Sequence, residues 1–382
     1  MPGLLQSSLH ITDFTRSPNH VSNSTTASPN VVPKLPGSFI STLLPAASAS
    51  LAVQVLFGIP SILNQTELAY DLGGGVGYYV TLATAFLVPV LRRRLAQAES
   101  EAAQVDVPVS ESRPITVKDL LKGLSLKDWN RRQLAVTGGT VMWAFRLSSY
   151  LFIRALKKGH DSRFTRTKHM PVRFAIFWFA QSIWVLLCSM PAIAVNSVPT
   201  EALNAISRKS PSKKGKEVAT KPKGKPEEDT PEAKSTMTDK LGLIVFLSGF
   251  ILETLADYQK NRWWAQKAKG IHNEDFITRG LWAKSQYPNY LGDILLNSGL
   301  AIFASGILIR QPVQSALGWN STPGGYLKAI LIPGLAPIFT AYTLLRLSGV
   351  PLSRRKYDRL YGGREDYNAW KESAGLLFPK LF

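Results

Sequence analysis

The chain has 382 residues, of which 45% are hydrophobic and 19% are charged, and its formal net charge is +19. Its single cysteine excludes a disulfide framework and a cysteine-rich zinc or iron–sulfur site, and its five histidines show no spacing typical of metal ligands. The charges are clustered, with long apolar blocks between the clusters, so we expect a membrane protein without a metal site.

Residues 1–40 are rich in Ser, Thr, Asn and Pro and contain few charges, which predicts a disordered N-terminal tail. The tail lacks the basic and then apolar layout of a cleaved signal peptide. It also lacks the Arg-rich composition of a mitochondrial presequence, since Arg16 and Lys34 are its only Lys or Arg residues. We therefore expect an integral protein of the endoplasmic reticulum membrane, with a mitochondrial membrane as the alternative.

Seven apolar blocks follow the tail, each near the length of about 20 residues that an α-helix needs to cross a bilayer. Backbone groups in hydrocarbon must be satisfied internally, and the blocks show no alternation typical of barrel strands, so the blocks are expected to be helices. The sequence therefore predicts an all-α polytopic membrane helix bundle with about 6–7 transmembrane helices. The blocks are 41–63, 74–91, 134–156, 172–195, 241–257, 291–310 and 327–348.

The loops between the blocks do not agree on one orientation. Four loops are basic and would all prefer the cytosol, but seven strict crossings cannot place all four on one side. At least one block must therefore re-enter the membrane, lie in its interface or cross against this rule. The basic loops are 92–133, 157–173, 205–240 and 258–284.

Two further loops, 64–73 and 311–326, contain no Lys or Arg. Each carries a glycosylation-type sequon, at Asn64 and at Asn320. Both loops are therefore candidates for the lumenal side of the membrane.

A basic segment divides the chain into two halves. Residues 207–236 hold nine Lys or Arg and five Asp or Glu residues with repeated Pro and Gly, which predicts a solvated linker. No aromatic residues are interleaved with these charges, so a linker is favoured over a nucleic-acid site. The predicted organisation is a tail at 1–40, a front transmembrane half at 41–204, a basic low-complexity linker at 205–238 and a C-terminal half with the cofactor site at 239–382.

The stretch 253–293 contains the densest mixture of charged and aromatic residues in the chain. Glu253, Asp257 and Lys260 follow one another at i, i+4 and i+7, so they share one face of a helix. These residue types also occur in an aromatic belt with basic anchors at a membrane boundary. The spacing alone leaves the belt and a binding site as alternatives.

The start of the sixth block favours a binding site. Pro288 suits the first turn of a helix, which places Asn289 and Asp293 one turn apart near its N-terminus. Unpaired amides and the helix dipole favour an anion there. Cations and aromatic rings near such a terminus indicate a cofactor that carries phosphate and flat rings.

The segment GLWAKSQYPNYLGDILL resembles the signature of the steroid 5-alpha-reductase C-terminal-domain family, and the preceding ETLADYQKNRW resembles the same family's helix end. The best fit is to a poorly characterised branch of membrane reductase-like proteins related to Δ14-sterol reductases. The resemblance covers roughly 135–382, interrupted by the linker. It departs from the usual Arg-His pair before Pro-Asn-Tyr, which is Gln286-Tyr287 here.

This resemblance implies a steroid-reductase-like fold that binds NADPH from the cytosolic side and reduces a carbon–carbon double bond in a lipid. Lys260 matches the position that binds the cofactor phosphate, and Arg262 or Arg279 would add a bidentate fork there. The resemblance implies that the remaining cofactor-binding residues are Asp257, Trp282, Asn289, Tyr290, Asp293, Asp358, Tyr361 and Trp370.

Reduction of a conjugated double bond needs a hydride and a donor that stabilises the developing oxyanion. Arg146 and Tyr150, one turn apart in the third block, are the candidate catalytic residues, and Tyr290 is a third candidate donor. The alternative for Arg146 is a buried ion pair with Glu253 or Asp257. The alternative for Tyr150 is ordinary helix packing.

We therefore expect an oxidoreductase of the CH–CH group that uses NADPH and acts on a sterol-like, enone or other lipid substrate. Its expected partners are this hydrophobic small molecule and the membrane, with no nucleic acid. One alternative is a methyltransferase of the isoprenylcysteine type that uses S-adenosylmethionine, although Gln286-Tyr287 breaks the related Arg-His-Pro motif. The other alternative is a non-catalytic membrane protein of the same fold.

Overall fold

The computed structural model describes residues 38–104, 116–158, 164–206 and 235–380. All of them lie within one compact unit, 36–382. Most of the predicted tail and most of the predicted linker therefore lie outside the described residues, and the last three residues of the predicted tail, 38–40, begin the first helix.

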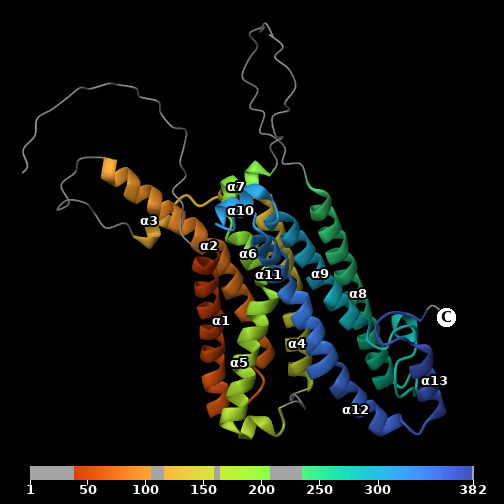
Figure 1. Ribbon diagram of the computed structural model, residues 1–382. Coiled ribbons are helices and arrows are strands. Elements are labelled where there is room, and N and C mark those ends of the chain that lie inside the picture. Colours follow the sequence, from red (N-terminus) through yellow and green to blue (C-terminus); the bar gives the residue numbers. More distant parts are fainter. Residues whose placement is uncertain (1–37, 105–115, 159–163, 207–234, 381–382) are drawn as a thin grey trace, which may run out of the picture. The chain divides into compact units, whose positions relative to one another are not determined.

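The described residues are predominantly helical, and their only β-pairing is an isolated bridge between Ser285 and Gly375. Six helical segments are long and apolar enough to cross a membrane, the last of them running on from α11 through α12 (Val350–Tyr361). The prediction of an all-α polytopic membrane bundle is confirmed. The main helices of these segments are α1 (Ser38–Leu63), α2 (Tyr70–Gln104), α5 (Pro171–Cys188), α8 (Met237–Ala268), α9 (Pro288–Leu308) and α11 (Pro323–Tyr342) (Figure 1).

Shorter helices connect these segments or cover their ends. Four of them are a single 3-10 or π turn, and the others have five to nine residues. They are α3 (Val117–Leu121), η1 (Leu126–Asp128), η2 (Thr167–His169), α6 (Met190–Asn196), α7 (Thr200–Ala205), η3 (Gly280–Ala283), α10 (Gln311–Ala316), η4 (Thr343–Leu347) and α13 (Glu365–Ser373).

The third predicted block forms α4 (Arg131–Lys158), but its composition is too polar for it to count among the six spans. Its 28 residues extend about 42 Å at 1.5 Å per residue, which is long enough to cross a bilayer core. Arg146 lies on the side of α4 that faces α8. The exposed large hydrophobic residues of α4 are Met142, Phe145, Ile153 and Leu156. The helix therefore turns a charge inward and apolar side chains outward, as a membrane environment favours.

The fourth predicted block is not one helix. The helix α5 ends at Cys188, and α6 begins at Met190 with Pro191 in its first turn. Proline has no N–H and its ring clashes with the carbonyl four residues earlier, which weakens a helix at this position. Prolines inside α1, α2 and α11 leave those helices unbroken, so Pro191 contributes to the interruption without being sufficient for it. The α6 helix is buried along its whole length and packs against α1, α2, α4, α5, α9 and α11, at the centre of the bundle.

The helices α8 and α9 make the most extensive contact between any two elements. Glycines lie seven residues apart on α8, at Gly242 and Gly249, and on α9, at Gly292, Gly299 and Gly306. A Cβ atom added to Gly249 would lie 2.6 Å from the carbonyl oxygen of Gly292. The two backbones therefore touch directly, as small residues allow in membrane helices.

The loops lie at two ends of the bundle, which we call the α10 end and the α13 end. Lys168 near the start of α5 forms an ion pair with Glu67 at 2.9 Å, so the α1–α2 loop lies beside η2. The α7 and α10 helices contact each other at the opposite end of α5 and α9 (Figure 1). The sequons at Asn64 and Asn320 therefore lie at opposite ends, and the prediction that both are lumenal is wrong because transmembrane helices separate them.

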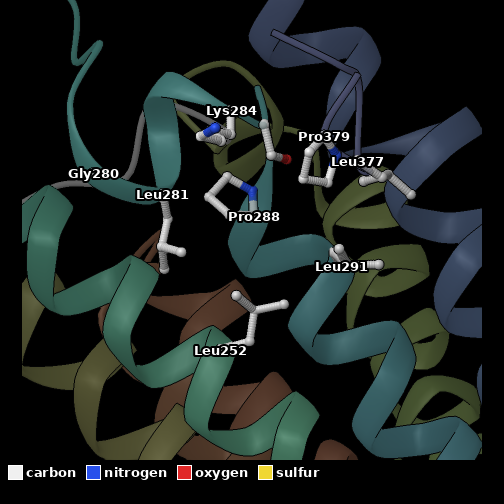
Figure 2. Close-up of a pocket in the computed structure, with 9 residues that line it drawn as sticks. Leu252, Gly280, Leu281, Lys284, Pro288, Leu291, Leu377 and Pro379 are labelled. Atoms are coloured by element: carbon white, nitrogen blue, oxygen red, sulfur yellow. The ribbon is translucent and has the colours of Figure 1, made fainter. Parts of the chain in front are cut away.

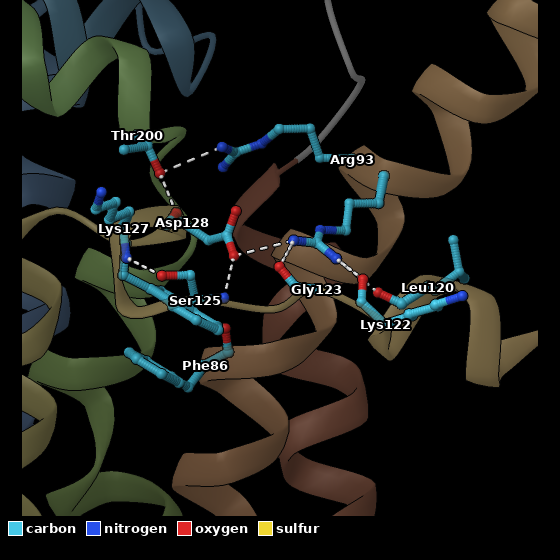
Figure 3. Close-up of polar contacts among 11 residues, drawn as sticks. Phe86, Arg93, Leu120, Lys122, Gly123, Ser125, Lys127, Asp128 and Thr200 are labelled. Carbon is cyan, nitrogen blue, oxygen red and sulfur yellow. Dashed lines mark hydrogen bonds and ion pairs between the residues drawn. The ribbon is translucent and has the colours of Figure 1, made fainter.

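At the α10 end, arginines of α2 and α4 fasten the described part of the loop between these helices and the neighbouring helices (Figure 3). Arg94 donates to the backbone carbonyls that end α3 and pairs with Asp128 at 3.0 Å. Arg93 donates to Thr200 Oγ1 at 3.2 Å. Arg132 pairs with Asp239 at 2.9 Å, with both side chains buried. These basic residues stabilise the end of the bundle.

Candidate functional site

The candidate site lies toward the α13 end, where the C-terminal turns of α8 extend beyond the apolar core of a bilayer. The 32 residues of α8 extend about 48 Å, against an apolar core of about 30 Å. The polar turns of α8 that carry Asp257 and Lys260 therefore reach the membrane boundary. The N-terminus of α9 begins beside them, held there by the glycine contacts.

A buried charged cluster joins α4, α8 and α9. Arg146 forms ion pairs with both Glu253 and Asp257, and the Arg146 Nη1 to Asp257 Oδ2 distance is 3.1 Å. Asn289 Nδ2 donates to Asp257 Oδ1 at 3.3 Å. Only 3% of Glu253 and 8% of Asp257 is exposed. We call these four residues the Arg146 cluster.

Asp293 lies one turn after Asn289 and interacts electrostatically with Glu253 and Arg146. Asn297 Nδ2 donates to Asp293 Oδ1 at 3.0 Å. One guanidinium therefore faces three carboxylates inside the bundle. Removal of charges from water is costly unless they are paired and hydrogen-bonded. The stability of the packed helices therefore depends on the ion pairs that Arg146 forms with these carboxylates.

The structure brings the predicted catalytic residues near the charged cluster, each with contacts of its own. Arg146 is paired with two carboxylates, as in the ion-pair alternative. The Tyr150 hydroxyl donates to Asn261 Oδ1 at 3.2 Å, and the Arg154 guanidinium lies 5.8 Å from the Tyr150 ring centre. The Tyr290 ring stacks on Tyr287 with centroids 5.2 Å apart and an interplanar angle of 5°.

A second group joins α8, η3 and α13, and we call it the Trp282 cluster. Lys260 Nζ lies 4.6 Å from the centre of the Trp282 ring, which is cation–π geometry. Trp282 Nε1 donates to the Ala256 carbonyl at 3.1 Å. Trp370 Nε1 donates to the Trp282 carbonyl at 2.8 Å. Three predicted cofactor residues from three separate segments, Lys260, Trp282 and Trp370, are therefore in contact.

Aromatic rings extend this cluster toward α12 and α13. Phe276 is surrounded by Tyr361, Tyr367 and Trp370 at ring-centre distances of 5.6, 5.2 and 5.7 Å. Asp358 accepts hydrogen bonds from the Tyr367 hydroxyl at 2.8 Å and from Lys371 at 2.6 Å. The predicted cofactor residues of α12 therefore help to fold the C-terminal segment onto the α8–α9 loop.

The two arginines predicted to assist Lys260 do not join it. Arg262 is exposed and lies two residues after Lys260, about 200° around the helix. Arg279 forms an ion pair with Glu274 on the α8–α9 loop. Hydrogen bonds from Trp263 and Arg279 hold the pKa of Glu274 below its usual value.

Gln286 has a role that sequence reasoning missed. Its Nε2 donates to the Lys371 and Ala374 carbonyls at 2.9 and 2.8 Å, and its Oε1 accepts from Arg354 at 3.3 Å. It therefore fastens the C-terminal segment to the start of α9. The available signal was an uncharged polar residue where the resembling family has a cation, but the sequence did not indicate which segment it binds.

A cavity of about 260 Å³ lies beside these clusters (Figure 2). It lies among α8, η3, the first turn of α9 and the C-terminal segment, and none of the predicted site residues lines it. Ligand pockets commonly have volumes of about 300–1,000 Å³, so this cavity is too small for a dinucleotide. Within the described residues, no group of three or more His, Cys, Asp or Glu side chains is placed to hold a metal ion.

Comparisons with known proteins give a family and no named relative. The matching family is described as "Protein of unknown function (DUF1295)", and its match covers residues 95–210 and 226–374. No curated protein and no solved structure matches the chain. The match includes α4, α8, η3, α9 and α13, and therefore both clusters. The chain thus belongs to the DUF1295 family, which is grouped with the steroid 5-alpha-reductase-like families.

Proposed function

We propose that this protein is a membrane reductase that uses NADPH to reduce a carbon–carbon double bond in a lipid. The observation that carries the proposal is the contact of Lys260 with the Trp282 ring, beside the hydrogen bond from Trp370 to Trp282. A cation next to an indole ring at a membrane boundary suits a cofactor with phosphate groups and flat rings. The family grouping supports the same chemistry.

Individual residues of the chain suit separate parts of NADPH. Lys260 would hold a phosphate, and Trp282 would lie against a flat ring. Asn289 Oδ1 is buried and makes no hydrogen bond within the described residues, so it would accept one from the carboxamide. When bound, the cofactor supplies the hydride.

The chain must also supply a proton donor. The Tyr150 hydroxyl carries its proton toward Asn261, and the neighbouring Arg154 offers a positive charge that would stabilise a developing oxyanion. Arg146 is paired with Glu253 and Asp257, so in this proposal it positions those carboxylates. Tyr150 and Tyr290 remain the proposed donors.

NADPH binding to the purified full-length protein in detergent tests the site. Lys260→Ala should weaken binding at least tenfold, because it removes the cation beside Trp282. Asn289→Ala should weaken it as well. Arg262→Ala is the matched control, since it removes one positive charge two residues away on the exposed side of the same helix. Equal binding by the wild type, Lys260→Ala and Asn289→Ala would refute the site.

Turnover is measured as NADPH oxidation with a panel of unsaturated lipids. One observation favours the alternative of a non-catalytic protein of the same fold: Arg146 and Arg279 are both held in ion pairs with protein carboxylates.

A comparison of the thermal midpoints of unfolding with NADPH, NADH and S-adenosylmethionine separates the candidate functions. NADPH should raise the midpoint most, and an equal or larger rise with S-adenosylmethionine would favour a methyltransferase.

A further inference from the structure

The cavity in Figure 2 has apolar walls contributed by four segments of the chain. Leu252 comes from α8, Leu281 from η3, Leu291 from α9 and Leu377 from the C-terminal segment. Pro288 and Pro379 complete most of the lining. The cavity is partly open, and its predominantly apolar lining suits a hydrocarbon ligand.

The wall formed by the C-terminal segment is held by backbone hydrogen bonds. Gln286 N donates to the Gly375 carbonyl at 2.8 Å, and Tyr287 N donates to the Leu376 carbonyl at 3.2 Å. Gly375 N donates in return to the Lys284 carbonyl at 3.2 Å. These bonds hold Leu377 next to the start of α9, so the position of this cavity wall is determined by the fold.

A positive charge is available beside this apolar space. Lys284 contributes to the lining and is exposed. Within the described residues, its ammonium group makes no hydrogen bond or ion pair. An anionic group at the cavity mouth would therefore pair with it without displacing another partner.

The volume limits what the cavity holds. A dry apolar cavity of about 150 Å³ binds benzene, which has six carbons. By proportion, about 260 Å³ holds about ten carbons. A segment of a single alkyl chain meets this limit, whereas a fused four-ring sterol exceeds it.

We propose that this cavity binds one alkyl chain of an anionic amphiphile, whose head group pairs with Lys284. Two sources share this chemistry: a fatty acid, with a carboxylate head, and a phospholipid, with a phosphate head. Such a site is separate from the residues that we propose for NADPH and is independent of that function.

Native mass spectrometry of the full-length protein in detergent tests the proposal with palmitate, lysophosphatidylglycerol and neutral hexadecanol. Leu377→Trp fills the cavity from outside the helices and should lower the fraction of protein carrying palmitate or lysophosphatidylglycerol at least tenfold. Leu291→Phe fills it from α9 and should have the same effect. Leu255→Trp, on the exposed face of α8, is the matched control and should bind as the wild type does. Unchanged binding in both filling variants, or an equal loss in Leu255→Trp, would overturn the proposal.

Lys284→Gln tests the head group separately. It should lower binding of the anionic ligands about fivefold and leave hexadecanol binding unchanged, and an equal loss for hexadecanol would contradict the ion pair. Stronger binding of palmitate than of lysophosphatidylglycerol identifies a carboxylate source, and the reverse identifies a phosphate source. NADPH binding should persist in Leu377→Trp, which keeps this result distinct from the test of the reductase.

Discussion

At the scale of single residues, the stability of the protein depends on the charged side chains buried between its helices. Arg146 faces Glu253, Asp257 and Asp293, so one cation serves three acidic groups. Removal of one partner of a buried ion pair typically costs about 3–5 kcal/mol, because the other charge is left uncompensated. The consequences of removing the cation and of removing an excess carboxylate should therefore differ in sign.

Arg146→Met should lower the free energy of unfolding by about 3–5 kcal/mol, since it strands three carboxylates. Asp293→Asn should leave stability unchanged or raise it, because it removes one of three acidic groups around a single cation and keeps an oxygen facing Asn297. Denaturation in mixed micelles measures both variants. The double variant Arg146→Met with Glu253→Gln should recover part of the loss. A stable Arg146→Met single variant would contradict this account.

At the scale of elements, the α8–α9 interface sets the geometry of the site. Because the two backbones touch at their glycines, Glu253 on α8 lies directly against Gly292 on α9. The same approach places Asp257 within hydrogen-bonding distance of Asn289. A widening of this interface would separate the carboxylates of α8 from the polar residues of α9.

Gly299→Ala should destabilise the protein by about 1–3 kcal/mol through overpacking. Its Cβ atom would lie 2.6 Å from Phe246 Cα and 2.7 Å from the Gly242 carbonyl oxygen, neither of which can move aside. Gly138→Ala on α4 is the matched control, since nothing lies within 4 Å of its added Cβ atom. Helix propensity alone should make the control slightly more stable, by about 0.5–1 kcal/mol. Thermal unfolding compares the two, and equal midpoints would argue against the close contact.

The interactions that hold α13 against the α8–α9 loop should weaken at acidic pH and should not change near neutral pH. Asp275 accepts hydrogen bonds from Lys267 at 3.1 Å and from Arg364 at 2.6 Å, and these bonds lower the pKa of Asp275. A carboxyl whose folded pKa is lowered contributes stability above its unfolded pKa of about 3.9, and loses it as the pH falls through the folded pKa. The protection factors of the α13 amides, which are corrected for intrinsic exchange, should therefore be constant from about pH 5 to pH 8 and fall below about pH 4. Asp275→Asn should reduce this change, and the remainder should come from Asp358 and Asp366, whose pKa values are also lowered by hydrogen bonds.

The sequence predicts much of this architecture because bilayer crossing requires long apolar helices. The break before Pro191 was not predicted, because hydropathy does not register it and prolines inside α1, α2 and α11 leave those helices unbroken. The Arg146 ion pair was anticipated as an alternative, since a cation in lipid needs a carboxylate. The role of Gln286 and the cavity beside Lys284 depend on the C-terminal segment returning to α9, which no local pattern encodes.

At the scale of the whole molecule, basic loops occur at both ends of the bundle, so the excess of Lys and Arg does not by itself set the orientation. The α10 end carries Arg93 and Arg94, and the α13 end carries Lys260, Lys284 and the basic residues of α12. The proposed function supplies the missing constraint. A reductase of this kind would take up NADPH from the cytosol, so under the proposed function the α13 end should face the cytosol and the α10 end should face the other side.

Cysteine accessibility tests this orientation with little background, because the single native cysteine, Cys188, is buried. Gly363→Cys at the α13 end and Gly324→Cys at the α10 end are both exposed, and an added Cβ meets only open space or one ordinary contact there. In sealed vesicles with the cytosolic face outward, a membrane-impermeant maleimide should label Gly363→Cys and spare Gly324→Cys until detergent is added. Labelling of Gly324→Cys alone would place the candidate site on the side without NADPH and refute the reductase. Labelling of both would contradict the separation of the two ends by α9.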